Sequence, residues 1–159
     1  MTRKGFDEMP CPIAQCLGVV GERWTLLVLR EAFFRVRRFD DFQRRLGIAR
    51  NILADRLSTL VDAGVLERRP YQDRPVRHEY RLTQKGLDLW PVLVALQAWG
   101  EKHAPAQSGP PIELTHTACG HRTVPQLACS HCGEPLGPRD VTAARELAGP
   151  AEFAAAARA

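Results

Sequence analysis

The stretch FDDFQRRLGIARNILADRLSTLVDAG (39–64) constrains the fold most, because it holds two amphipathic helices joined by about three residues. Apolar side chains recur at helical spacing in both helices: Phe39, Phe42 and Leu46 in the first, and Leu53, Leu57, Leu60 and Val61 in the second. Gly47 and Gly64 are suited to end them. The outer side of the second helix is polar. This layout predicts a helix-turn-helix with 48–63 as its recognition helix.

Two strand-like runs follow the helix pair, VLERRPY and RHEYRLT, on either side of the turn residues in QDRP. They predict an antiparallel hairpin over 65–82, and a hairpin directly after a recognition helix is a wing. Thr83 is placed to cap a long helix that reaches His103. Pro91 is expected to kink or break that helix.

The segment CPIAQCLGVVGERWTLLVLREAFF (11–34) predicts two helices on either side of Gly21, with Pro12 in a first helical turn. The expected fold class is therefore mainly α with a small β-hairpin wing, an α+β winged helix-turn-helix. The expected domains are a DNA-binding and dimerisation domain (1–103), a linker (104–111), a ribbon-like extension (112–140) and an Ala-rich tail (141–159).

Basic charge is concentrated in one part of the chain. The net charge is +4, but residues 35–85 hold 13 Arg or Lys against 7 Asp or Glu. Such a concentration suits a phosphate-binding surface, although a solvated helical face is the alternative. No apolar run approaches the ~20 residues that cross a bilayer, and the N-terminus does not resemble a signal peptide. We therefore expect a cytoplasmic protein without membrane contact.

The candidate DNA contacts fall in three places. Arg50 and Asn51 stand at the start of the recognition helix, where side chains reach base edges, although Arg50 could contact phosphate alone. Arg44, Arg45 and Arg56 are phosphate candidates, and a carboxylate such as Asp55 or Asp62 could hold Arg56 instead. The wing contributes Arg68, Arg74 and Arg77, the last two near its tip. The segment 35–38 is interpreted as a polar link.

Several segments resemble the HxlR family of winged-helix transcriptional regulators, within the MarR/ArsR-like superfamily. They are CPIAQCLGVVGERWTLLVLREAFF with its early cysteine, RRFDDFQRRLGIARNILADRLSTLVDAGVLERRPY, and RPVRHEYRLTQKG. The resemblance implies a homodimer, built from the first and last helices of the domain, that binds a pseudo-palindromic operator and more commonly represses. Ala49 departs from the family, which often has Ser there, so the recognition helix is expected to lack its N-cap hydroxyl. Arg74 and His78 make this wing more basic.

Cys11 is a candidate redox sensor. It precedes Pro12 at the start of a helix, and helix N-termini favour the thiolate form of cysteine. The resemblance adds that some family members sense electrophiles or oxidants with a cysteine at this place. The alternative is a small apolar residue packed at the dimer interface. Cys16 lies on an apolar stripe and is expected in the core.

The extension HTACGHRTVPQLACSHCGEP (116–135) holds three of the five cysteines and three of the five histidines. Two residues separate His116 from Cys119 and Cys129 from Cys132, and a glycine follows each pair. Two such pairs supply four ligands for a structural tetrahedral zinc, as in a minimal zinc ribbon. His121 and His131 are rival ligands. A Cys129–Cys132 redox pair and a metal-free relic are the alternatives.

Three functions compete on these observations. A DNA-binding regulator without catalytic residues fits the helix-turn-helix, the wing and the local charge. A thiol oxidoreductase using Cys129 and Cys132 lacks the βαβ context of thioredoxin-like motifs. A winged-helix interaction module that does not bind DNA fits the concentrated arginines poorly. The sequence does not identify an effector molecule.

Overall fold

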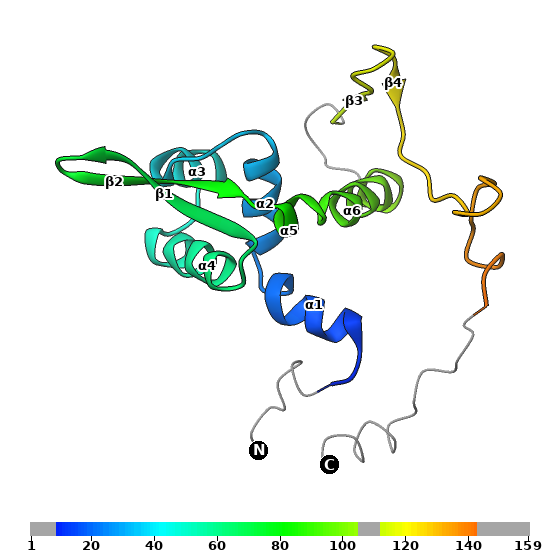
Figure 1. Cartoon of the computed structure of the whole chain (residues 1–159), viewed down its shortest axis with the longest axis horizontal. Coiled ribbons are helices and arrows are strands. Elements are labelled where there is room, and N and C mark those ends of the chain that lie inside the picture. Colours follow the sequence, from blue (N-terminus) through cyan, green and yellow to red (C-terminus); the bar gives the residue numbers. More distant parts are fainter. Residues whose placement is uncertain (1–8, 105–111, 143–159) are drawn as a thin grey trace. The chain divides into compact units, whose positions relative to one another are not determined.

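In the part of the chain that the structure describes, four helices precede the first strand (Figure 1). The structure is a computed structural model that describes residues 9–104 and 112–142. The helices are α1 (Pro12–Val20), α2 (Thr25–Phe33), α3 (Phe39–Leu46) and α4 (Arg50–Asp62). Pro12 is in the first turn of α1, and the Gly21 N–H donates to the Leu17 carbonyl at 2.8 Å to close the helix. The predicted break at Gly21 is therefore confirmed.

The helix pair α3–α4 has the predicted geometry. Gly47 ends α3 with a positive φ of 65°, and three residues separate the two helices. Ala49 caps α4 without any side-chain hydrogen bond, as its missing hydroxyl requires. The apolar stripes meet α2 in one core, whose fully buried side chains are Val28, Leu29, Phe42, Leu53, Leu57 and Leu60. This core fixes which side of α4 remains outside.

The wing is an antiparallel hairpin of β1 (Leu66–Asp73) and β2 (Val76–Leu82), and both strands extend closer to the tip than the sequence suggests. Its base is tied to the segment between α2 and α3. The Tyr80 N–H donates to the Arg37 carbonyl at 2.7 Å. The backbones of Arg38 and Glu79 pair in an isolated antiparallel β-bridge. The order of these elements is that of a winged helix-turn-helix, so the predicted fold class is confirmed.

The predicted long helix is two helices, α5 (Gln84–Leu87) and α6 (Trp90–His103). Thr83 caps α5 as expected, since its Oγ1 accepts the Gly86 N–H at 3.2 Å. The interruption falls just before Pro91, so the predicted break is also confirmed. Gly86 is buried where a Cβ would lie 2.3 Å from the Val65 carbonyl oxygen, which explains a glycine at this position.

The described residues divide into two compact units, 9–90 and 91–142. The second contains most of α6 and a short hairpin of β3 (Leu114–Thr115) and β4 (Arg122–Thr123). The Gln97 amide donates to the Ile112 carbonyl at 2.7 Å and ties α6 to this hairpin. Apart from Ala104, Val141 and Thr142, the predicted linker 104–111 and tail 141–159 lie outside the described residues. No described helix is long and apolar enough to cross a membrane.

Candidate nucleic-acid interface

The N-terminus of α4 presents its polar side chains to solvent. Arg50 is the first residue of the helix and its side chain is 71% exposed. Its guanidinium lies 4.6 Å from the centre of the Phe39 ring and 3.6 Å from an Asp40 carboxylate oxygen. Asn51 beside it is exposed, as are the other residues of the predicted outer face, Ala54, Asp55 and Ser58. Both predicted base-reading side chains are therefore accessible.

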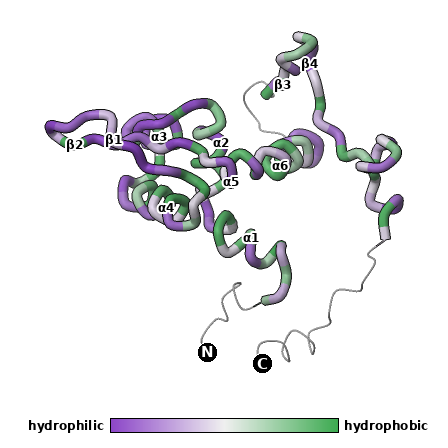
Figure 2. Tube along the Cα trace, in the orientation of Figure 1, coloured by the Kyte–Doolittle hydropathy of each residue, from purple (hydrophilic) through white to green (hydrophobic). Residues whose placement is uncertain are grey.

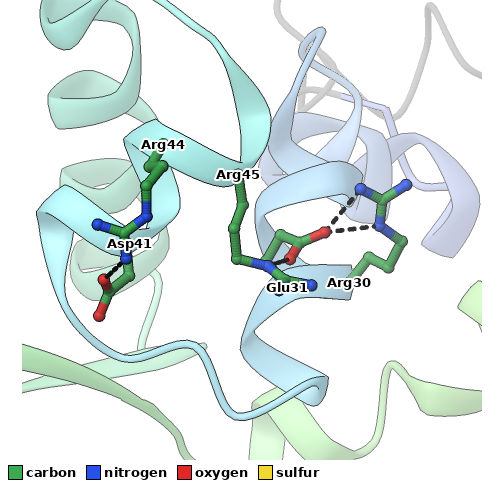
Figure 3. A network of polar contacts seen from close by, with 5 residues as sticks. All are labelled: Arg30, Glu31, Asp41, Arg44 and Arg45. Carbon is green, nitrogen blue, oxygen red and sulfur yellow. Dashed lines mark hydrogen bonds and ion pairs between the residues drawn. The ribbon is translucent and has the colours of Figure 1, made fainter.

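Arg45 is engaged in an ion-pair network inside the domain (Figure 3). Its Nε donates to Oε2 of Glu31, while Arg30 donates to Oε1 through Nε at 3.0 Å and Nη2 at 2.6 Å. The Glu31 side chain is only 3% exposed. Burial raises its pKa, but the hydrogen bonds and charges of Arg45 and Arg30 outweigh it, and the pKa lies below its usual 4.5. Glu31 thus holds Arg45 of α3 against α2.

The other two predicted phosphate contacts differ in accessibility. Arg44 is 72% exposed and pairs with Asp41 one helical turn away, a surface pair that is easily exchanged. Arg56 is only 15% exposed and is held by Asp55 and, at 3.5 Å, by Glu22. The structure therefore favours the alternative in which a carboxylate holds Arg56, and Arg44 is the better candidate for phosphate.

The wing carries its basic side chains on an exposed hairpin, which Figure 2 shows as mainly hydrophilic. Arg74 lies in the turn, Arg77 is the second residue of β2, and both are exposed. Arg68 is also exposed, with Nη2 2.9 Å from Nδ1 of His78. Its neighbour Arg69 pairs with Glu67 at 2.7 Å and lines a cavity with residues of α2. Because adjacent strand residues point to opposite faces, only Arg68 of the two faces away from α2.

Sequence reasoning missed a basic cavity beside α3. Arg35, Arg37 and Arg38, which were interpreted as a link, surround a space of about 500 Å³. The full lining is Arg35, Val36, Arg37, Arg38, Asp41, Arg44, Arg45 and Glu79. Five arginines against two acids make it suited to a phosphate group. The run RVRR directly before the helix-turn-helix was the available signal.

The cysteines are all free of disulfide bonds. Cys11 is the N-cap of α1 and is half-buried, as is Cys16, which was expected in the core. The Nδ1 of His116 lies 3.3 Å from the sulfur of Cys119. Backbone N–H groups of Cys132 and His131 and the Cys132 side chain lower the pKa of Cys129. His116 and Cys119 are thus in contact, but no three potential ligands gather at one point within 9–104 and 112–142.

Comparison with known proteins gives one consistent result. The family described as HxlR-like helix-turn-helix matches residues 19–108. An uncharacterised HTH-type transcriptional regulator of Mycobacterium tuberculosis, Rv3095, is 52% identical over 130 residues, 82% of both chains. The regulator YdeP of Bacillus subtilis is 32% identical over 61% of this chain and 77% of its own.

Solved structures agree with this assignment. PA1607, a candidate transcription factor, has a TM-score of 0.75 at 38% identity and covers 86% of this chain and 96% of its own. The redox regulator HypR in its reduced form has a TM-score of 0.55 at 29% identity, over 58% of this chain and 92% of its own. The geometry of α3, α4 and the wing and these likenesses lead to the same conclusion. The chain belongs to the HxlR-like family of helix-turn-helix transcriptional regulators.

Proposed function

We propose that this regulator is a homodimeric repressor that binds a pseudo-palindromic operator through α4 and the wing. The observation that carries the proposal is the exposure of Arg50 and Asn51 at the N-terminus of α4. The opposite, apolar side of the same helix is fully buried in the core. An α-helix fits the major groove, where Arg pairs with guanine and Asn with adenine, each worth ~1–3 kcal/mol of discrimination. These two residues are the proposed base readers.

Phosphate contacts would position this helix on the duplex. Arg44, Arg35 and Arg37 are candidates beside α3, because they line the basic cavity. Arg74 and Arg77, which are exposed near the wing tip, are the proposed contacts to the flanking minor groove. Contacts of this kind set register and affinity but carry no sequence information themselves.

Dimerisation is supported by apolar surface that one chain leaves uncovered. On α1, Ile13 is 69% and Leu17 is 42% exposed. On α6, Leu96 is 48% and Trp99 is 61% exposed. Apolar faces of this kind on terminal helices are usually covered by a partner, and two-fold symmetry is the commonest arrangement. A symmetric dimer would also present two copies of α4 to the two halves of an operator.

We also propose that the regulator responds to oxidants or electrophiles through modification of the Cys11 thiol. Its place at the first turn of α1 next to the exposed apolar face would let a modified sulfur disturb the dimer. HypR, a structural neighbour, is a redox regulator by name. Cys11 is only half-buried, which is compatible with oxidant access.

The salt dependence of DNA binding tests the proposal. An operator selected from a random duplex pool would be titrated by fluorescence anisotropy at several salt concentrations. A plot of the logarithm of the DNA-binding constant against the logarithm of the salt concentration should become less steep by about one unit per wing in Arg77→Ala. The variant should bind all duplexes more weakly by about the same factor. Arg69→Ala is the matched control, because that side chain faces α2 and pairs with Glu67. If the pool contains no sequence bound better than random duplex, the chain is a protein-interaction module instead.

A further inference from the structure

The first hairpin of the second unit closes in a turn that points two side chains in one direction. The His116 N–H donates to the His121 carbonyl at 2.9 Å, and the Gly120 N–H donates to the His116 carbonyl at 2.8 Å. Gly120 has a positive φ of 71°, which other residues adopt only with strain. In this turn Nδ1 of His116 comes within 3.3 Å of the Cys119 sulfur.

The second hairpin repeats this turn bond for bond. The Cys129 N–H donates to the Glu134 carbonyl at 2.8 Å, and the Gly133 N–H donates to the Cys129 carbonyl at 2.9 Å. Gly133 has a φ of 78°. A bridge between Ala128 and Pro135 pairs the chain on either side of the turn, as β3 and β4 do in the first hairpin.

The equivalence of the two turns identifies which residues correspond. His116 occupies the place of Cys129, and Cys119 that of Cys132. His121 corresponds to Glu134, outside the turn, where it contributes its carbonyl. We propose that His116, Cys119, Cys129 and Cys132 form one structural zinc site per chain, and that His121 and His131 are not ligands.

The chemistry of these four side chains suits zinc. Three thiolates and one imidazole make a closed tetrahedral site, which is typical of structural rather than catalytic zinc. Soft sulfur ligands also disfavour magnesium and calcium, which prefer oxygen.

The segment needs such a site because it has no core. Within 112–142 no side chain is buried, and Val124 and Leu127 are 66% and 72% exposed. Apolar burial therefore contributes little to holding the two turns in place. Small folds in this situation are commonly stabilised by a metal, whose binding energy becomes folding energy.

Closing the site requires the two hairpins to turn toward each other. The hairpins are separated by 124–126, so the chain from Thr123 to Leu127 spans at most about 14 Å. The two turns already share the same backbone hydrogen bonds, and the connecting segment is short enough to keep one ligand pair at high local concentration around the other. Zinc would then join two preformed halves.

Zinc content of the full-length protein tests this site independently of DNA binding. The reduced protein would be loaded with Zn²⁺ and its metal content measured by native mass spectrometry, with competition against a chromophoric chelator for affinity. We expect one zinc per chain. Cys129→Ser and His116→Ala should each weaken binding more than about 100-fold, because residues that only orient a ligand already contribute ~10- to 100-fold. His121→Ala and Cys16→Ser are the matched controls and should retain full zinc.

Substitution with Co²⁺ supplies a second readout that does not depend on variant stability. Intense visible ligand-field bands report tetrahedral geometry, and sulfur-to-cobalt charge-transfer intensity counts the thiolates. The proposal requires a tetrahedral spectrum with three thiolates. Loss of metal in His121→Ala but not in His116→Ala, or a reduced wild-type chain that takes up no zinc, would overturn it.

Discussion

Replacing Glu31 by Gln tests whether the buried carboxylate holds α2 and α3 together. The carboxylate accepts three hydrogen bonds from Arg30 and Arg45 through both of its oxygens. Glutamine keeps the shape but loses the charge and replaces one acceptor oxygen with an NH2 group, which cannot accept a bond from arginine. Bonds to charged groups contribute ~1.5–3 kcal/mol and neutral ones ~0.5–1.5, so losing one bond and weakening the other two would cost about 4 kcal/mol if all were fully buried. The arginine side chains are 40% and 51% exposed, and solvent screening reduces the expected loss to about 1–2 kcal/mol.

The assay is urea unfolding of wild type and Glu31→Gln across pH. The folded-state pKa of Glu31 lies below its usual 4.5, so its contribution is complete above that value and is lost as pH falls through the folded pKa. The difference in unfolding free energy should therefore be about 1–2 kcal/mol at pH 7. It should shrink steadily once the pH drops below about 4.5.

The matched control is Asp41→Asn, which removes an exposed pair with Arg44 from the same helix (Figure 3). It should cost no more than about 0.5 kcal/mol. A Glu31→Gln protein as stable as wild type at pH 7, or a difference that does not change at acid pH, would refute the assigned role of Glu31.

Three further predictions follow from other parts of the structure. Gly86→Ala should lower the unfolding free energy by about 1–3 kcal/mol, since the new Cβ would meet the Val65 carbonyl at 2.3 Å; equal chemical denaturation midpoints would contradict that packing. Trp99→Glu should shift the dimer to monomer in sedimentation equilibrium, and an unchanged mass would place the interface elsewhere. Cys11→Ser should bind operator normally but lose its response to diamide, whereas a wild-type response would exclude Cys11 as the sensor.

Much of the fold could be predicted from the sequence because glycine and proline residues mark where its helices end or break. Gly21, Gly47 and Pro91 mark breaks that the structure contains, and the stripe of Leu53, Leu57 and Leu60 is fully buried. The burial of α1 was harder to predict. The apolar spacing there suggests a core-facing stripe, yet Ile13 is largely exposed in one chain. Periodicity identifies an apolar face but does not say whether the same chain covers it.

The sequence predicts which helix and hairpin carry the candidate DNA contacts. It does not predict which of their arginines are paired with carboxylates. Exposure of Arg50 and Asn51 follows from the position of the buried stripe on α4, so both could be chosen from the sequence. The pairing of Arg45 with Glu31 joins residues 14 positions apart, and only tertiary packing reveals it. The basic cavity likewise depends on how Arg35 and Arg37 fold back beside α3.

Base discrimination by Arg50→Ala tests the central claim most directly. Wild type and the variant would be titrated against the selected operator and against duplexes with single substitutions in each half-site. If Arg50 reads a guanine, the variant should bind the operator about 5- to 150-fold more weakly per half-site. It should also no longer distinguish that base pair from its substitutes. A variant that binds more weakly but keeps the full base preference of wild type would contradict the assignment of Arg50 as a base-reading residue.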